Sequence, residues 1–375
     1  MVLKKKIIIG CFYVPGWGGP ATAGYSLFEM MQSEGLDVDY VNFIYEKDYD
    51  SLSMRFGDAL GNPKALPNVH TFIIDEVINL PFQNNSLNNF IENLCPDIII
   101  GITWRTAFLM KQAAPHVHLI FLPSGSESLK AYIRKGQVKS FIDVHNKLVN
   151  SDLGWFKPDI IEKEAARNSD LIITHSESVL TLFRYLFPDL RNKIYPEILW
   201  WAEWTCSEAL RYSNFKKPFE ERDIDLIFVS NNWGRPEKNY PLLEEIIRKR
   251  MDLRIHIIGE INGKTNGAFN HSFIVRQEDL FHLMGRAKAL VSPSLFDASP
   301  GILYEAAVMG CNLVASKNCG NWKICNERLL VDTFNINSFL EKIDLAVLQE
   351  FKSNLDFFIN SDSYKKLKNV IADFN

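Results

Sequence analysis

The sequence lacks any apolar run long enough to cross a bilayer. A membrane-spanning helix needs about 20 consecutive apolar residues, whereas the longest early run, 7–14, contains Gly10 and is followed by Pro15. The first residues also lack the longer apolar region and the small-residue cleavage site of a secretory signal. We therefore expect a cytoplasmic protein, and a peripheral contact with the inner face of a membrane stays open.

Cysteine is scarce, and its spacing is not that of a metal site. The six cysteines form no C-x-x-C pair, and Cys311, Cys319 and Cys325 have no histidine beside them at zinc-ligand spacing. We interpret the cysteines as buried or incidental thiols. No metal site is expected from them.

Positive charge is not in excess. The 375 residues include 41 Lys and Arg against 45 Asp and Glu, so the formal net charge is −4, and there is no long basic stripe. We therefore expect no nucleic-acid partner. The shares of hydrophobic (47%) and charged (23%) residues are those of a folded globular protein. The length suits two domains of about 150 to 200 residues each.

Short apolar runs alternate with helical patterns as far as about Tyr195 and again from about Asp223. Continuous apolar strands of this kind indicate parallel sheets that are covered on both faces. The sequence therefore predicts an α/β protein with two Rossmann-like, doubly wound domains facing across a cleft. The expected domains are 1–195 and 196–354, with a C-terminal helix at about 355–375 that packs back on the first domain. The expected strands are 4–12, 37–45, 70–75, 96–103, 118–123, 170–176, 223–231, 253–260, 271–276, 288–294 and 312–316.

The segment KALVSPSLFDASPGILYEAAVMG, at 288–310, is the most informative. In open parallel sheets, ligands bind beyond the carboxyl ends of the strands. Here a strand is followed by a loop with Asp297, and Ser299 and Pro300 have the pattern of an N-cap and a first helical residue. The segment therefore predicts a ligand-facing loop that leads into a helix.

The start of that helix is a candidate anion site. The amides of Gly301 and Ile302 are free of helical hydrogen bonds, and the positive end of the helix dipole lies behind them. Glu305 is the only charged residue between Asp297 and Lys317. Because a lone buried carboxylate costs several kcal/mol, Glu305 needs donors such as ribose hydroxyls or a structural partner. A Glu at the solvent edge of a core helix is the simpler alternative.

Two further segments carry ligand-binding features. In DLIFVSNNWGRPEKNYPLLEEI, Arg235 and Lys238 precede a helix, where two cations oppose the dipole unless an anion lies between them. Side chains that extend into water are the alternative. In CFYVPGWGGPATAGYSLFEMM, Gly18 and Gly19 permit a close approach of the backbone to a ligand. This turn is not G-x-G-x-x-G, which weighs against a dinucleotide site.

At the second domain the sequence resembles the retaining family 4 glycosyltransferases of GT-B architecture. Their signature is P-S-x-x-E-x-x-G-x-x-x-x-E-A-x-x-x-G, and this chain has P-S-L-F-D-A-S-P-G-I-L-Y-E-A-A-V-M-G. Asp297 and Glu305 take the two carboxylate positions. The glycine pair, the Ser176 segment, R-P-E-K and FIVRQEDLFHLMGRAKALVSPS follow the family order. The resemblance is strong from Asp225 to Gly320 and faint before it.

The resemblance implies that 1–195 is the acceptor domain and 196–354 the nucleotide-sugar donor domain, with a role for each matching residue in binding the donor. Arg235 and Lys238 would hold the donor diphosphate, and Asp297 would contact the hydroxyls of the transferred sugar. The amides of Gly301 and Ile302 would meet phosphate. The remaining donor contacts would be Glu305 on the ribose hydroxyls, the backbone near Val275 on the base, and Gly19, next to Gly18, on the phosphates from the opposite domain.

The chain departs from the family pattern at four places. The first carboxylate is Asp rather than Glu, and Pro300 takes the place of the signature glycine. In the first domain, 122–125 reads Leu-Pro-Ser-Gly where the family has a histidine, and Trp104 and Arg105 follow an earlier strand where a histidine often stands.

We predict a glycosyltransferase of the hexosyltransferase type that uses a UDP- or GDP-sugar. Its acceptor would be a glycan, a lipid-linked saccharide or another hydroxyl compound, and the resemblance implies retention of configuration. No D-x-D triplet stands in a loop of the expected donor site, so we expect no metal or other cofactor. The alternatives are a nucleotide-sugar epimerase, a sugar phosphorylase or an inactive nucleotide-sugar-binding module.

Two other segments allow more than one interpretation. The aromatic run 199–204, LWWAEW, favours packing between domains over an acceptor platform. The basic, partly apolar segment 129–150 favours a solvated face over a membrane-surface helix, because Gly136 interrupts it.

Overall fold

The structure is a computed structural model that describes residues 5–13, 19–50, 68–75, 84–150, 156–261, 269–273, 276–331 and 335–374. The chain divides into two compact units. The first comprises Met1–Ser128 and Phe156–Glu197, and the second comprises Leu129–Trp155 and Ile198–Asn375. The segment Leu129–Trp155, expected in the first domain, thus belongs to the second unit.

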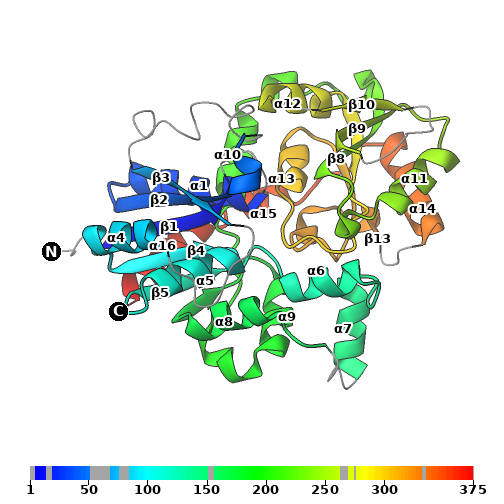
Figure 1. The fold of residues 1–375 in the computed structure, drawn as a ribbon. Helices are drawn as coiled ribbons and strands as arrows, with labels where there is room; N and C mark the ends of the chain where they lie inside the picture. The colour runs from blue at the N-terminus through cyan, green and yellow to red at the C-terminus, as the bar shows by residue number, and fades with distance from the viewer. Residues whose placement is uncertain are drawn as a thin grey trace. The chain divides into compact units, whose positions relative to one another are not determined.

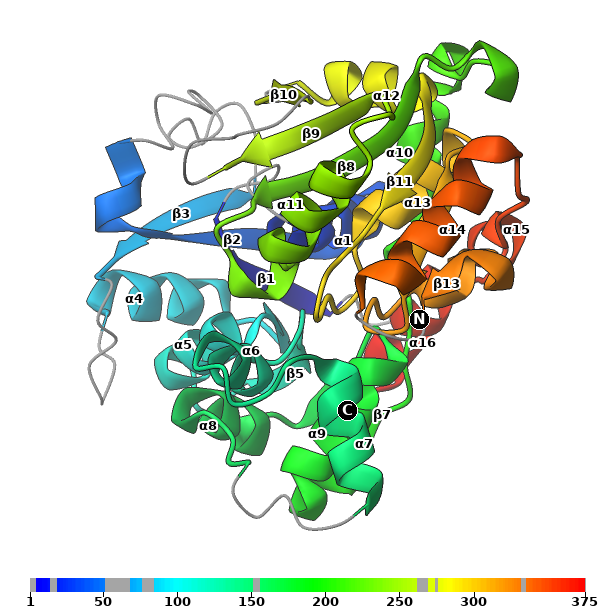
Figure 2. The ribbon, with the colours of Figure 1, turned by 90° about the vertical axis from the view of Figure 1, so that its right-hand side faces the viewer.

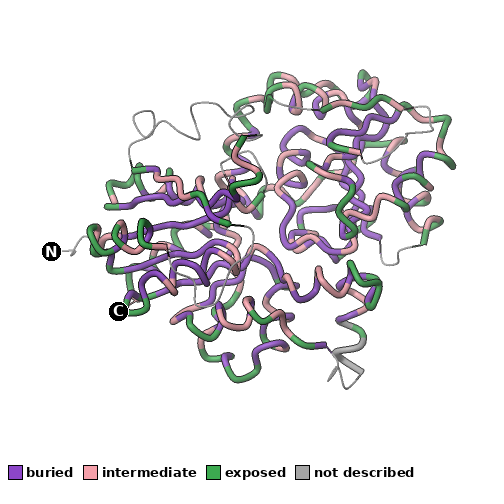
Figure 3. Tube along the Cα trace, in the orientation of Figure 1, coloured by how far each residue is buried: buried purple, intermediate pink, exposed green. Residues whose placement is uncertain are grey.

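The first unit is built on a seven-stranded sheet in the order β3-β2-β1-β4-β5-β6-β7 (Figure 1). All neighbouring strands are parallel. Most of the strand residues are buried, as Figure 3 shows, which explains their continuous apolar character. The strands are β1 (Lys6–Phe12), β2 (Asp37–Tyr45), β3 (Val69–Ile74), β4 (Ile98–Ile102), β5 (His118–Leu122), β6 (Leu171–Ile173) and β7 (Ile194–Tyr195).

Helices cover both faces of this sheet. Gly101 in β4 lets a helix lie directly on the strand, because a Cβ at this position would stand 2.5 Å from the Ala107 Cα. The helix on the other face contains Gly24, whose added Cβ would meet Cys11 of β1 at 3.3 Å. The helices with residues in this unit are α1 (Gly19–Ser33), α4 (Asn85–Leu94), α5 (Trp104–Ala113), the start of α6 (Glu127–Arg134), α8 (Ile160–Asn168) and α9 (Glu177–Leu186), followed by the 3-10 helix η1 (Pro188–Lys193).

The second unit contains a six-stranded sheet in the order β10-β9-β8-β11-β12-β13, again with parallel neighbours (Figure 2). Its apolar core has two parts, one on each face. The strands are β8 (Ile224–Asn232), β9 (Ile255–Glu260), β10 (Asn270–Ser272), β11 (Ala287–Val291), β12 (Asn312–Ser316) and β13 (Leu330–Val331).

Two groups of helices complete these cores. One core takes side chains from α11 and α14, and the other takes side chains from α10, α12, α13 and α15. The helices are α7 (Phe141–Asn150), α10 (Ala202–Leu210), α11 (Tyr240–Lys249), α12 (Gln277–Gly285), α13 (Gly301–Val308), α14 (Ile336–Leu348), α15 (Leu355–Ile359) and α16 (Ser363–Asp373). The 3-10 helices are η2 (Ser213–Phe215), η3 (Phe219–Glu221), η4 (Pro236–Lys238), η5 (Trp322–Ile324) and η6 (Glu327–Leu329).

The predicted fold class is confirmed in its main feature, two α/β units with parallel sheets. The C-terminal helix α16 clusters with the second unit, and its packing on the first stays a prediction. In the expected aromatic run, Trp200 and Trp201 are buried. Five of the six cysteines are buried as free thiols, and Cys95 is exposed. None of the helices in the described ranges has both the length and the apolar character that crossing a bilayer requires.

Candidate functional site

The carboxyl edge of the six-stranded sheet brings the predicted donor segments together. Strand order reverses between β8 and β11, because β8 is followed outward by β9 and β11 by β12. Doubly wound sheets bind ligands at such a switch point, outside the carboxyl ends of the two strands. Arg235 and Lys238 follow β8, and Asp297 follows β11. These predicted residues therefore lie where this architecture binds ligands.

Lys238 and Asp297 form an ion pair at the switch point. The Lys238 ammonium donates a hydrogen bond to Oδ2 of Asp297, and the side chains are only 15% and 19% exposed. The backbone of Asp297 is also fixed, since its amide donates to the Asn318 carbonyl at 3.0 Å and its carbonyl accepts from Gly320 at 2.8 Å. The two loops thus hold a cation and a carboxylate together, largely shielded from water.

Arg235 has a carboxylate partner of its own in η4. Its Nε and Nη2 donate to Oε1 of Glu237 at 3.1 Å and 2.7 Å. Burial by itself would raise the pKa of Glu237, but the Arg235 guanidinium lowers it to about 2. Glu237 had no role in the sequence analysis, although its place between two cations was a usable signal. Glu237 and Asp297 supply the anions that two cations near a helix start require, so neither cation simply extends into water.

Helix α13 begins one residue later than the sequence pattern predicts. Pro300 is its N-cap and makes no side-chain capping bond, so Ser299 is not the cap. The first turn contains no acidic residue. Among the described residues, no acceptor is hydrogen-bonded to the amides of Gly301 and Ile302. The predicted anion site at this helix start therefore has its donors in place.

Glu305 lies one turn further along α13 and keeps a small part of its side chain accessible. Burial raises the pKa of its carboxyl to about 7. No donor within the described residues is hydrogen-bonded to this carboxylate. Its carboxylate also acts on Cys206 of α10. Burial and the charge of Glu305 raise the pKa of the Cys206 thiol to about 12. Glu305 is therefore a partly buried carboxylate that no donor among the described residues holds.

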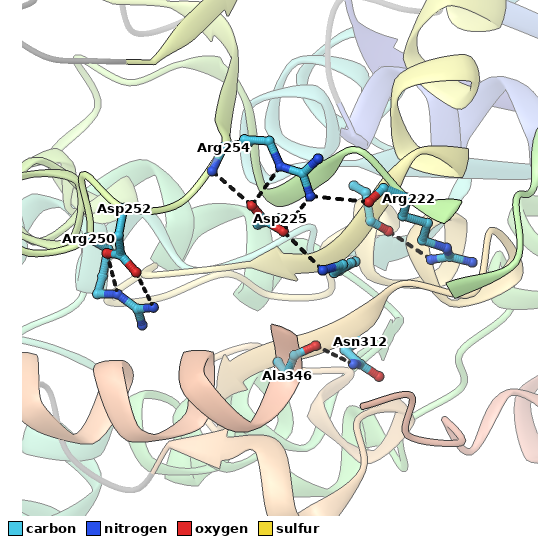
Figure 4. A network of polar contacts seen from close by, with 9 residues as sticks. Arg222, Asp225, Arg250, Asp252, Arg254, Asn312 and Ala346 are labelled. Carbon is cyan, nitrogen blue, oxygen red and sulfur yellow. Dashed lines mark hydrogen bonds and ion pairs between the residues drawn. The ribbon is translucent and has the colours of Figure 1, made fainter. Parts of the chain in front are cut away.

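The other end of α13 is held by Arg222, which the sequence analysis did not single out. Arg222 is buried, and its Nη1 donates to the carbonyls of Ala287 at 2.7 Å and Gly310 at 2.8 Å. Its Nη2 donates to Met309 at 3.1 Å. Figure 4 shows Arg222 beside the ion pair of Arg254 with Asp225, at the start of β8. These bonds fix the carboxyl end of α13 and thereby the position of its amino end.

The loop of Asp297 also carries helix α7, which comes from a distant part of the sequence. The Phe141 amide donates to Leu295 at 3.1 Å, and the Ile142 amide donates to Oδ1 of Asn318 at 2.8 Å. The rings of Phe141 and Phe296 lie 6.1 Å apart. Asn318, which the sequence analysis missed, thus ties α7 to the backbone that orients Asp297.

The remaining predicted residues are not brought to this edge by any described contact. Gly18 and Val275 lie outside the described residues. Gly19 is the first residue of α1 and belongs to the first unit. The structure thus places Arg235, Lys238 and Asp297 together, and adds Gly301, Ile302 and Glu305 on α13 beyond the same strand, β11.

The arrangement can bind an anion and orient hydroxyl groups. Two cations and two free backbone amides are suited to a diphosphate. Two carboxylates are suited to accepting hydrogen bonds from hydroxyls, one of them in a place where water competes little.

No family model matches the sequence, and no curated protein matches it. Known structures match this one over nearly the whole chain, but their sequences are only 12 to 14% identical to it. An apo lipopolysaccharide outer core galactosyltransferase, WaaB, is 14% identical, with a TM-score of 0.61, and the match covers 98% of this chain and 99% of that one.

Two further matches have the same breadth. Anabaena Alr3699/HepE in complex with UDP and glucose is 12% identical, with a TM-score of 0.60, and 99% of this chain and 100% of that chain are covered. The UDP-GlcNAc 2-epimerase from Methanocaldococcus jannaschii is 12% identical, with a TM-score of 0.56 and coverages of 98% and 99%. At these identities the likeness shows the fold, which is that of GT-B proteins.

Proposed function

We propose that this protein is a GT-B glycosyltransferase that moves a sugar from a UDP- or GDP-sugar to a hydroxyl acceptor with retention of configuration. The acceptor would be a glycan or a lipid-linked saccharide. The structural neighbours support the transferase class, since WaaB is a galactosyltransferase and HepE was solved with UDP and glucose. The switch point of the second sheet would be the donor site.

In this proposal the donor exchanges partners with the ion pair at the switch point. The diphosphate takes Lys238 from Asp297, because two phosphate charges compete well for one ammonium. Asp297 is then free to accept hydrogen bonds from hydroxyls of the sugar. Arg235 keeps its two hydrogen bonds to Glu237, which use Nε and Nη2. Its Nη1 is not used by these bonds and turns toward phosphate.

Catalysis would act mainly on the leaving group. Negative charge grows on the nucleoside diphosphate as the glycosidic bond breaks, and fixed donors aimed at that charge lower the barrier. Lys238, Arg235 and the amides of Gly301 and Ile302 are such donors. We propose that they replace a divalent cation, so that EDTA leaves the rate of transfer unchanged.

One observation carries the proposal: the partly buried carboxylate of Glu305 has a raised pKa and, within the described residues, no hydrogen-bond donor. Retaining such a group costs stability unless a ligand supplies the donors. The two vicinal hydroxyls of a ribose have the chemistry that this carboxylate requires.

A two-step experiment tests the proposal. UDP, GDP and ADP are first screened for thermal stabilisation, where a ligand at about 100 times its dissociation constant adds roughly 2.7 kcal/mol. The matching nucleotide sugar is then incubated with and without saccharide acceptors. The proposal requires release of free nucleoside diphosphate that depends on the acceptor, and a protein that binds none of the three nucleotides contradicts it.

A nucleotide-sugar epimerase is the second candidate, because an epimerase is among the structural neighbours. The same screen separates the two functions. An epimerase converts the nucleotide sugar with no acceptor present, whereas a transferase leaves its configuration unchanged until an acceptor is added.

A further inference from the structure

The seven-stranded sheet has a switch point of its own, which the donor site does not use. Strand order reverses between β1 and β4. Tyr13 directly follows β1, and Trp104 and Arg105 begin α5 just after β4. Tyr45, the last residue of the neighbouring β2, completes what we call the switch-point cluster: Tyr13, Tyr45, Trp104 and Arg105. Ligands of open parallel sheets bind at this place.

The cluster is organised around the guanidinium of Arg105. Its Nη1 donates to the hydroxyl of Tyr45. Its central carbon lies 4.7 Å from the ring centroid of Trp104 and 5.5 Å from that of Tyr45. The ring of Tyr13 meets Tyr45 edge-on, with centroids 6.1 Å apart. Two aromatic rings and one hydrogen bond therefore fix the orientation of a planar cation, and Tyr13 packs against one of those rings.

This cation has no carboxylate partner among the described residues. An acid next to the cluster, Asp48, accepts a hydrogen bond from the Tyr13 hydroxyl at 3.1 Å. A second cation, Lys47, lies 6.0 Å from the Tyr45 ring. The contrast with the second sheet is direct, since Lys238 and Arg235 both have carboxylates. A half-buried guanidinium that only neutral groups hold retains its full affinity for an anion.

The backbone at both edges of the cluster is in an unusual conformation. Tyr13 has φ of 65° and Thr103, between β4 and Trp104, has φ of 79°. Positive φ is uncommon for a residue with a side chain and is an outlier for a β-branched one. Such conformations are retained where the surrounding structure requires them, often at ligand sites. Here Tyr13 is itself part of the cluster, and Thr103, the N-cap of α5, directly precedes Trp104.

We propose that the switch-point cluster binds the acceptor and that the acceptor is a saccharide bearing a phosphate or carboxylate group. Trp104 and Tyr45 would pack against the apolar faces of sugar rings, and Arg105 would take the anionic group through the N–H groups that Tyr45 does not use. This inference names the acceptor class for the proposed glycosyltransferase and rests on that function. It also assigns a binding role to Arg105, at a position where the resembled family often has a histidine.

The test measures binding rather than transfer. Glucose 6-phosphate, glucuronate and glucose are titrated by calorimetry into the wild type in the presence of saturating UDP, which occupies the second sheet. We expect glucose 6-phosphate or glucuronate to bind more tightly than glucose. Removing the charged partner in Arg105→Gln should weaken the tighter ligand by about tenfold to a hundredfold. Arg184→Gln, which changes an exposed arginine of α9 in the same unit, should not.

Two additional variants keep the result interpretable. Arg105→Lys keeps the charge but loses the planar fork, so it should weaken binding less than Arg105→Gln. If the Gln variant does not fold, the Lys variant and Tyr45→Phe, which removes only the hydroxyl, carry the test. Equal binding of all three sugars, or equal affinity in wild type and Arg105 variants, overturns the proposal and leaves Arg105 as a structural cation.

The outcome is separable from that of the proposed function. UDP binding is measured in the same samples, and a protein that does not bind UDP contradicts the proposed donor site. The sugar titrations are then repeated without UDP in a Lys238→Ala background. Those titrations still report on Arg105, because they do not depend on the donor site. Unchanged UDP binding in Arg105→Gln together with lost sugar-phosphate binding supports both proposals.

Discussion

The helix starts of α6 and α13 offer the same backbone donors and treat them in opposite ways. At α6 the protein fills the site itself: the buried carboxylate of Glu162 accepts from the amides of Glu127 at 2.9 Å and Ser128 at 3.0 Å, and from the Ser126 hydroxyl at 3.2 Å. The Ser128 hydroxyl also donates to it. At α13 the corresponding amides have no acceptor among the described residues, and Glu305 has no donor.

We interpret the start of α6 as structural and the start of α13 as a ligand site. Burial raises the pKa of Glu162 and of Glu305 to about 7 in both cases. For Glu162, hydrogen bonds from Ser128 and Glu127 oppose the effect of burial, and the result is a closed local structure. For Glu305 burial is the one cause, so the group stays at a cost that a bound ligand can offset. A shifted pKa therefore marks a site only when the hydrogen bonds around it are also counted.

The largest expected effect concerns Lys238, which in our proposal holds the donor diphosphate together with the open start of α13. Lys238→Ala should lower the turnover number by about 30- to 1000-fold, because a fixed donor to a developing anion contributes roughly 2 to 4 kcal/mol to the barrier. Steady-state kinetics at saturating donor measures this, with the exposed Lys249→Ala as control. Lys238→Arg should not restore the full rate. Wild-type turnover in both Lys238→Ala and Arg235→Ala would leave the diphosphate to Gly301 alone.

At the start of α6, which Glu162 closes, a substitution should change the stability of the protein rather than its turnover number. Glu162→Gln leaves at least one buried donor of α6 facing an amide nitrogen, at a cost of about 1 to 3 kcal/mol for each such donor. Urea unfolding at pH 8 measures the loss of stability. Glu164→Gln, on the same helix α8 as Glu162, is the control. UDP affinity should not change. A Glu162→Gln protein as stable as the wild type would remove the contrast between the two helix starts.

Glu305→Gln should raise the free energy of unfolding, whereas Glu162→Gln should lower it. The folded protein binds the Glu305 proton more tightly than the unfolded chain, so this group lowers stability as pH rises from the unfolded pKa toward about 7. At pH 8 the Gln variant should be more stable than the wild type by about 1 to 3 kcal/mol, and at pH 4 the two should agree. Urea unfolding across this range tests the sign, with the exposed Glu350→Gln as control.

The smallest effect is the pH dependence of UDP binding. Ribose hydroxyls form stronger hydrogen bonds with an ionised carboxylate than with a protonated one, and below about pH 7 the carboxyl of Glu305 is mostly protonated in the free protein. Wild-type affinity for UDP should therefore fall by up to about tenfold per pH unit below 7. Glu305→Gln, which has no such titration, corrects for protonation of the diphosphate itself. If UDP affinity depends on pH in the same way in both proteins, Glu305 does not contact the ligand.

The fold and the donor segments could be predicted from local patterns. Continuous apolar strands indicated two parallel sheets, and the run from Asp297 to Glu305 indicated a loop that leads into a helix with free amides. The start of α13 was one residue off, because Ser299 and Pro300 fit a capping pattern that the helix does not use. The partners of Lys238 and Arg235 were missed, although Glu237 stands between them in the sequence.

Other features have no local signal. Asn318 meets Ile142 across 176 residues, and a single asparagine after a strand gives no reason to expect it. The four donors of Glu162 come from a segment more than 30 residues earlier in the chain. Arg105 was visible only as a departure from a family pattern, and its value as a site depends on strand order, which brings β1 and β4 together.

The most direct test of the donor site compares UDP with 2′,3′-dideoxy-UDP in the wild type and in Glu305→Gln. If Glu305 accepts from the ribose hydroxyls, the wild type should bind the dideoxy analogue about tenfold to a hundredfold more weakly than UDP. The Gln variant should bind both with affinities that agree within about twofold, since the interacting pair is then absent. The same preference for UDP in both proteins, measured by calorimetry at pH 8, would contradict the account and place the ribose elsewhere.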